Sequence, residues 1–288
     1  MIHMYSSDDG FCFIHANNSE FESNQSNDVI KEIDERKYLW TPEKYTGRDG
    51  NERNFGYVTY KVLNSSRSFP DNTFEKLALT VALRTWGFRT KKIRFKRERD
   101  PNKQADITLK FARKEDDEYF KNKPSVLAYA YYPTSSPIGG DITFNDDYLW
   151  SVNGDPMTGK EAKEKGLVDP RTDDSVQLKT FNIIHTLTHE CGHAIGLKHQ
   201  TVCKECVMYP YYNGKVRLHD CGDRDYYVNG IRTSLTPEAV KEYVKNNVFL
   251  DPAEQAHDVD RIQGLYGKRN ISTYIIDLFR RRVLRRYG

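Results

Sequence analysis

The stretch from His189 to His199 constrains this chain more than any other feature. It reads H-E-x-x-H-x-x-G-x-x-H, with Glu190 beside the first histidine and His193 four residues after it. Two histidines at i and i+4 lie on one face of a helix, where both imidazoles can share a tetrahedral Zn²⁺. Gly196 can adopt a left-handed backbone, so the chain can leave the helix, turn back and supply His199 as the third ligand.

Glu190 has a different task from the histidines. It projects about 100° around the helix from His189, so it cannot bind the ion with the same geometry. It can instead reach a water held at the open fourth position of the zinc. A chance match to the whole pattern is too rare to compete, because the chain holds only 8 His in 288 residues. The motif therefore predicts a catalytic zinc site with Glu190 as general base.

Composition excludes several classes of protein. No apolar run approaches the roughly 18 residues that a membrane span needs. The opening residues lack the basic and apolar regions of a secretory signal peptide, so none is predicted. Five cysteines are an odd and sparse set, which argues against a disulfide-dense scaffold.

The charges divide the chain into three parts. Residues 1–50 hold 10 Asp/Glu and 5 Lys/Arg, a net charge of −5, and are read as an acidic polar leader, flexible or a pro-segment. Residues 268–288 hold 7 Lys/Arg and one Asp, a net charge of +6, and form a basic tail. Residues 51–267 are long enough for one catalytic domain, with an insertion at about 211–250.

Hydrophobic periodicity predicts an α+β fold for that domain. Runs with strand composition lie at 57–63, 92–95, 106–111, 126–132 and 142–144. Helices are predicted over 72–87, over 176–195, from Thr236, and from Asp251 to Gly267. The zinc motif falls on the second of these helices.

Six further motifs lie on both sides of the zinc motif. They are Ala105-Asp106-Ile107, the LAYAY run at 127–131, Gly139-Gly140-Asp141, the CVMYP run at 206–210, Pro210-Tyr211-Tyr212 and the DVDRIQGLYG run at 258–267. With the zinc motif, the sequence resembles the matrixins, the matrix metalloproteinase family of the metzincin zinc peptidases, over about residues 51–267. The resemblance implies a metzincin-like α+β fold, with a twisted five-stranded mixed sheet, three main helices and the HExxHxxGxxH motif on the active-site helix.

The resemblance also implies an activity. The chain is expected to be a zinc-dependent metalloendopeptidase that cleaves extended protein substrates, with Glu190 moving the proton of the attacking water to the leaving amine. Leu127 and Ala128 would offer backbone hydrogen bonds to the substrate. The remaining expected site residues are the pocket residues His185, Pro210 and Tyr212, and Met208 beneath the zinc. For His185, a packed or solvated histidine is the competing interpretation.

The resemblance has different implications for two other metal sites of matrixins. A calcium ion is expected at Asp106, Pro137, Gly139 and Asp141, whose oxygen atoms suit a hard cation. Ordinary turn and capping roles are the alternative for the two aspartates. The structural zinc of matrixins is expected to be lost, because its ligand positions correspond to Asp116, Glu118, Tyr129 and Thr143.

The cysteines near the zinc motif leave three alternatives open. Cys203 and Cys206, with His219 and Cys221 from the insertion, could form a second zinc site. A disulfide from Cys203 or Cys206 to Cys221 is the second alternative. Inert thiols are the third.

The basic tail reads as an amphipathic helix with an apolar stripe. It could pack on the domain, pair with an acidic partner or bind an anionic membrane surface. Nucleic acid is not expected as a partner, because the excess charge is confined to one short element, and we expect a monomer. The alternative function is a catalytically silent zinc-binding interaction module that acts through its charged termini. The presence of Glu190 argues against it.

Overall fold

The computed structural model describes part of the chain. The described residues are 11–15, 39–40, 44–46, 52–69, 73–87, 89–134, 137–152, 154–204, 206–214, 227–228, 231–232 and 256–268. None of the helices formed by these residues is long and apolar enough to cross a membrane.

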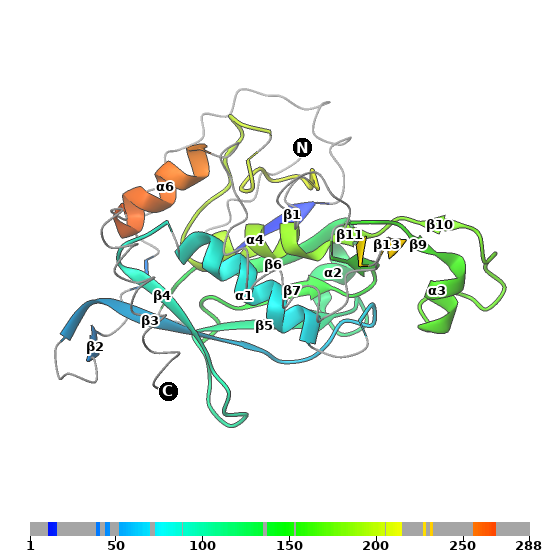
Figure 1. The fold of residues 1–288 in the computed structure, drawn as a ribbon, viewed down its shortest axis with the longest axis horizontal. Helices are drawn as coiled ribbons and strands as arrows, with labels where there is room; N and C mark the ends of the chain where they lie inside the picture. Colours follow the sequence, from blue (N-terminus) through cyan, green and yellow to red (C-terminus); the bar gives the residue numbers. More distant parts are fainter. Residues whose placement is uncertain are drawn as a thin grey trace.

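A mixed β-sheet forms the body of the molecule (Figure 1). The five predicted runs appear as β3 (Glu52–Val62), β4 (Ile93–Arg97), β5 (Ile107–Ala112), β6 (Val126–Tyr131) and β7 (Ile142–Asn145). The predicted number of strands is nevertheless wrong, because β1 (Phe11–His15) and β2 (Lys44–Thr46) bring the sheet to 7 strands. Both extra strands come from the polar leader, whose sequence has no sustained hydrophobic alternation from which strands could be predicted. The strand order is β1-β6-β7-β5-β3-β2, with β4 also paired to β3.

Strand β6 lies between two antiparallel neighbours. Ala128 faces Phe144 of β7 on one side and Ile14 of β1 on the other. Ile14 is fully buried in the main hydrophobic core. The strands β3, β4, β5 and β7 pair in parallel instead. The leader thus covers the outer edge of β6.

Helices α1 (Thr73–Gly87) and α4 (Ile183–Ala194) pack against each other and against the sheet (Figure 1). Trp86 of α1 is buried, and its Nε1 donates a hydrogen bond to the Thr188 carbonyl in α4 at 2.9 Å. At the end of α4, Trp40 donates through Nε1 to the Ala194 carbonyl at 2.7 Å. Helix α4, which carries two of the motif histidines, is therefore held at its middle and at its C-terminal end by tryptophan hydrogen bonds.

Helix α4 begins later than the hydrophobic pattern predicts. The Asn182 side chain accepts a hydrogen bond from the His185 backbone N–H and caps the helix at this point. Residues before the cap form strands instead: β10 (Gln177–Leu178) pairs with β9 (Met157–Thr158), and β11 (Phe181–Asn182) pairs with β8 (Trp150–Ser151). The helix prediction is wrong for residues 176–182, because their apolar side chains serve these short strands.

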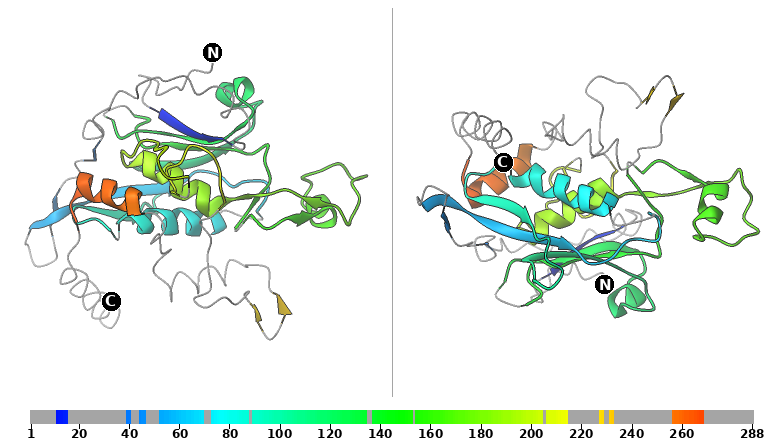
Figure 2. Two further views of the ribbon diagram at one scale, coloured as in Figure 1. Left: turned by 90° about the horizontal axis from the view of Figure 1, so that it is seen from above. Right: turned by 60° about the horizontal axis from the view of Figure 1, so that its bottom comes forward.

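The remaining described elements are α2 (Glu118–Asn122), α3 (Gly159–Glu164), α6 (Ala256–Tyr266), β12 (Tyr227–Val228) and β13 (Ile231–Arg232). The segment with β9, α3 and β10 projects away from the sheet (Figure 2). The predicted last helix is found as α6, and residues 251–255 lie outside the described residues. The helix predicted from Thr236 and the tail beyond residue 268 also lie outside them.

Candidate metal centre

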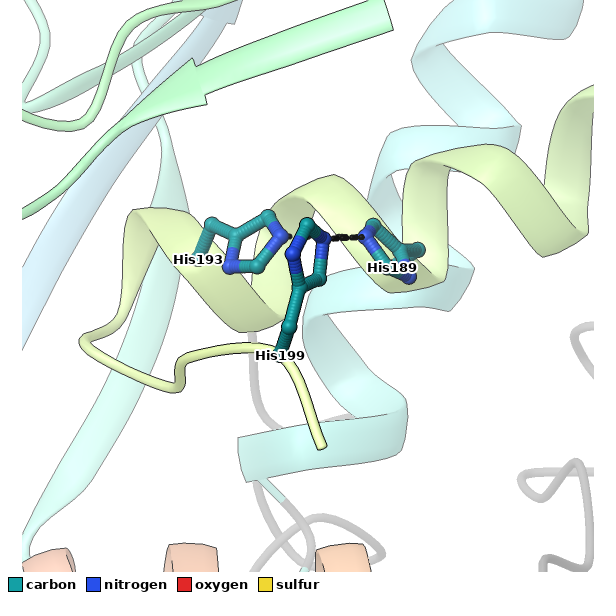
Figure 3. Close-up of side chains that lie close together, drawn as sticks. All are labelled: His189, His193 and His199. Carbon is teal, nitrogen blue, oxygen red and sulfur yellow. Dashed lines mark hydrogen bonds between the residues drawn. The ribbon is translucent and has the colours of Figure 1, made fainter. Parts of the chain in front are cut away.

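Three histidine side chains converge beside α4 (Figure 3). His189 Nε2 lies 3.0 Å from His193 Nε2 and 3.2 Å from His199 Nε2. His189 and His193 are one turn apart on α4, and His199 arrives from the segment after the helix. The backbone reverses at Gly196, whose φ of 101° is the left-handed conformation that glycine favours. The sequence motif thus folds as its spacing predicts.

Backbone carbonyls orient two of the rings. His189 Nδ1 donates to the Val207 carbonyl at 2.6 Å, and His193 Nδ1 donates to the Leu197 carbonyl at 2.7 Å. A carbonyl only accepts hydrogen bonds, so each of these rings carries its proton on Nδ1. The lone pair of each Nε2 then points to the shared centre. Such carbonyl partners are the usual support of metal-binding histidines.

The geometry fits a tetrahedral cation. Two nitrogen ligands about 2.0–2.1 Å from a zinc ion and about 109° apart are separated by about 3.3 Å, close to the observed spacing. Burial also favours the neutral rings that bind metal, because it lowers the pKa of His189 to about 4 and lowers the pKa of His193 well below its usual range. The Nε2 lone pairs of His189 and His193, 3.0 Å apart, repel each other, and a cation bound between them would remove this repulsion.

Glu190 lies on α4 directly after His189 and is fully buried. Neither of its carboxylate oxygens has a hydrogen-bond partner among the described residues. Burial raises the pKa of this carboxyl group well above its usual value. A buried carboxyl without a partner is costly, which points to a role with a ligand or water.

Met208 is buried against the helix that carries the ligands. A side chain added at Gly192 would overlap Met208 Sδ, so the helix and the methionine touch at this glycine. The Met208 N–H donates to Asp258 Oδ2 at 2.9 Å, and the Met208 carbonyl accepts from the Gln200 N–H at 3.0 Å. Met208 therefore fixes the position of the loop that carries the Val207 carbonyl.

Comparison with known proteins identifies the family. The matrixin model matches residues 51–231, more than half of the chain. The chain belongs to the matrixin family. Matrix metalloproteinase-2 of Drosophila melanogaster is 30% identical over 172 residues, which cover 59% of this chain and 19% of that protein. Karilysin of Tannerella forsythia is 29% identical over 180 residues, with 60% and 32% covered.

A third relative is similar over a longer stretch. Matrilysin of Felis catus is 29% identical over 217 residues, which cover 75% of this chain and 60% of that protein. The chain thus matches between about a fifth and three fifths of the length of these curated relatives. Membership of the matrixin family agrees with the resemblance carried by the motifs and with the α+β fold.

The predicted pocket residues lie close to the histidines of this matrixin. The His185 and Tyr212 rings meet edge to face, with centroids 5.2 Å apart. The Tyr212 hydroxyl accepts a hydrogen bond from the Asn182 N–H at 2.9 Å. Pro210 is half-buried. The His185 and Tyr212 side chains therefore contact each other, and their part in a substrate pocket stays a prediction.

Leu127 and Ala128 lie in β6, with fully buried side chains. Their outer backbone edge, which a substrate is expected to use, is paired with β1. Helix α4 contacts both β6 and β1. The structure therefore places a strand of the same chain at the expected peptide-binding edge.

The predicted calcium residues are engaged within the protein. Asp106 Oδ2 accepts hydrogen bonds from the Thr59 N–H and hydroxyl, both at 2.6 Å. Asp141 Oδ1 accepts from the Thr108 hydroxyl at 2.6 Å. Pro137 is exposed and Gly139 is buried. These bonds link residues of neighbouring strands rather than closing a turn or capping a helix, and calcium here stays a prediction.

An aromatic cluster lies at the positions that correspond to the second zinc of matrixins. The Tyr129 hydroxyl donates to Asp117 Oδ2 at 2.9 Å. Tyr129 also packs against Tyr119 and Phe120, with ring centroids 5.0 and 5.4 Å away. Among the described residues, the one group of side chains with metal-ligand spacing is the histidine cluster. Packing and a hydrogen bond thus hold Tyr129 in place, and the loss of the second zinc stays a prediction.

Three groups that build the site were not predicted from the sequence. The Leu197 and Val207 carbonyls orient the imidazoles, but a backbone carbonyl has no signature in the sequence. Asn182 caps α4 and binds Tyr212, and an Asn three residues before His185 was a detectable capping signal. This signal was not used, because the apolar residues before Asn182 predicted a helix that begins earlier.

The buried His185 makes the stability of the protein sensitive to acid. Burial lowers the pKa of His185 to about 3, whereas an unfolded histidine titrates at about 6.5. The unfolded chain therefore binds the proton first, and stability falls as the pH drops from about 6.5 toward 3. For zinc-free protein at pH 5, we expect this residue to cost about 2 kcal/mol relative to pH 8. Urea unfolding of His185→Leu at both pH values should show the loss reduced by that amount.

The matched control for this prediction is His257→Leu, because His257 is exposed on α6. This variant keeps the buried His185, so its loss of stability in acid should still include the contribution of that residue. If His185→Leu loses as much stability between pH 8 and pH 5 as the control does, His185 is protonated in the folded state and the prediction fails.

Proposed function

We propose that this matrixin is a zinc-dependent endopeptidase that hydrolyses extended protein substrates. One observation carries the proposal: the Nε2 atom of His189 lies 3.0 and 3.2 Å from those of His193 and His199, and the next residue, Glu190, is a buried carboxyl group that has no partner among the described residues. A purely structural metal site has no use for such a carboxylate. The curated relatives, which include two proteins named as metalloproteinases or matrilysins, support the same class of activity.

The residues of the chain divide the chemical work. His189, His193 and His199 would hold the ion. When bound, zinc acts as a Lewis acid toward the scissile carbonyl and the attacking water. Glu190 would accept the proton of that water and deliver it to the leaving amine. Burial raises the pKa of this carboxyl group well above its usual value, which makes it a better proton acceptor.

A pocket next to the zinc would select the substrate side chain. His185 and Tyr212 would form one wall of it, because the imidazole packs against the tyrosine ring. We expect this neutral histidine to disfavour the longest aliphatic groups, because it shortens the pocket and presents a polar ring. A peptide library cleaved by the unsubstituted chain and by His185→Leu would reveal the change in preference.

The function is tested by digestion of casein or gelatin with and without a zinc chelator. Proteolysis that stops with the chelator and returns with added zinc supports the proposal. The contrary result is a protein that binds one zinc per chain but cleaves neither substrate, even when β1 no longer covers the edge of β6. It would support the alternative function, a catalytically silent zinc-binding module.

Strand β1 covers the edge of β6 that a substrate is expected to use. A substrate that pairs with β6 as an added strand must displace β1, because both need the same backbone groups. We expect Ile14→Ala to weaken the docking of β1, since truncating a buried isoleucine costs about 2–5 kcal/mol. The variant should have a lower KM for a peptide substrate, measured by fluorescence on a quenched peptide.

Ile14→Val is the matched control, because it keeps most of the buried side chain and should leave KM nearly unchanged. Hydrogen exchange of the β6 amides would verify that β1 has left in the alanine variant. An unchanged KM despite faster exchange in β6 would show that β1 and the substrate do not compete.

A further inference from the structure

The loop between His199 and Met208 holds two cysteines outside the proposed chemistry. Cys203 and Cys206 are unbridged in the structure. The Cys206 N–H donates to the Cys203 carbonyl at 3.2 Å, which closes a β-turn with the cysteines at its first and last positions. The α-carbons at those positions of a β-turn lie within about 7 Å, which overlaps the range that a disulfide requires.

The two thiols are also close neighbours, because Cys203, after burial, contributes to the raised pKa of the Cys206 thiol. The turn is held in this conformation by Gln200, whose Oε1 accepts from the Cys203 N–H at 2.9 Å and whose Nε2 donates to the Cys203 carbonyl at 2.7 Å. Because the backbone is already fixed, closing a disulfide needs little rearrangement.

The cysteines differ in their access to solvent. Cys203 is half-buried, whereas Cys206 is fully buried beside the start of α6. Burial raises the pKa of the Cys206 thiol to about 12, so it stays protonated at neutral pH. Cys203 is therefore the sulfur that a reagent in solution can reach first.

We propose that Cys203 and Cys206 form a reversible disulfide by exchange with a low-molecular-weight disulfide such as oxidised glutathione. The Cys203 thiolate attacks one sulfur of the reagent, breaks its S–S bond and releases one small thiol. The Cys206 sulfur then attacks Cys203 Sγ in the mixed disulfide, gives up its proton and releases the second small thiol. The two cysteines are oxidised by two electrons, and the reagent is reduced to two thiols.

The position of the pair links this modification to the metal centre. Cys206 directly precedes Val207, whose carbonyl accepts the His189 Nδ1 proton at 2.6 Å. A covalent closure of the turn fixes the segment that carries this carbonyl. Groups that orient metal-binding histidines affect how strongly the metal is held. The oxidised chain should therefore lose zinc to a chelator more slowly than the reduced chain.

The sequence allows a direct test on the full chain. Trypsin cleaves after Lys204, between the two cysteines, and after Lys215 and Arg217, which separates Cys221 from both. After treatment with oxidised glutathione, we expect the loss of two thiols per chain and a linked pair of peptides, one ending at Lys204 and one beginning at Glu205. Dithiothreitol should restore both thiols. The same linkage should form in Cys221→Ser.

Two variants follow the order of events. Cys206→Ser should accumulate a glutathione adduct on Cys203, and Cys203→Ser should leave Cys206 unmodified. The proposed pair is wrong if either cysteine is instead linked to Cys221. It is also wrong if both thiols resist oxidation until a chelator removes zinc, because the cysteines would then bind a metal. Equal rates of zinc loss from oxidised and reduced chain would overturn its link to the metal centre.

Discussion

Replacing Glu190 with glutamine is expected to lower peptide turnover at least about 100-fold while zinc stays bound. The amide keeps the size of the side chain but cannot accept the proton of the attacking water. The three imidazole nitrogens are unchanged, and Glu190 is not one of the groups that converge on the centre. The measurement combines the initial rate on a quenched peptide with the zinc content of the same sample.

Glu164→Gln provides the matched control, because Glu164 is an exposed carboxylate at the end of α3. That variant should keep both its rate and its zinc. Thermal unfolding of the two variants would show whether each is folded. Near-normal turnover by Glu190→Gln with a full complement of zinc would remove the general base from the proposal.

The elements that depend on local sequence could be predicted. The spacing of His189, His193 and His199 placed two ligands on a helix and one beyond a glycine turn, and the structure has this arrangement. Five of the strands were predicted for the same reason, since alternation and β-branched residues act over a few neighbours. The family could be predicted as well, because its motifs combine several such local patterns.

Elements that depend on distant partners could not be predicted. Strand β1 exists because it pairs with β6, more than a hundred residues away, and its own short sequence gave no alternation to detect. The apolar residues before α4 pair instead with a distant strand, because β11 lies beside β8, and the helix pattern did not reveal this pairing. Tyr129 occupies a position where the resemblance to matrixins implies a zinc-binding histidine. The sequence showed this difference but did not predict that Tyr129 packs against Phe120.

Zinc should also contribute to the stability of the folded chain. An ion that binds the folded state alone stabilises it by about 4.1 kcal/mol when its free concentration is 1,000 times its Kd. In a domain of about 150–250 residues, each kcal/mol raises the Tm by about 2–4 °C. The converging imidazoles exist as a site in the folded chain only, because His199 reaches the other two through the turn at Gly196.

Replacing His193 with alanine should therefore abolish the thermal stabilisation by zinc. For the unsubstituted chain, we expect zinc to raise the Tm by about 8–16 °C under those conditions. His193→Ala removes the middle ligand of the cluster and the hydrogen bond to the Leu197 carbonyl, so it should bind zinc weakly and show little shift. His257→Ala, at an exposed position on α6, should keep the full shift, which separates loss of this site from loss of any histidine. Differential scanning calorimetry with and without zinc measures all three proteins. A shift in His193→Ala equal to that of the control would mean that zinc stabilises the chain from somewhere other than this cluster.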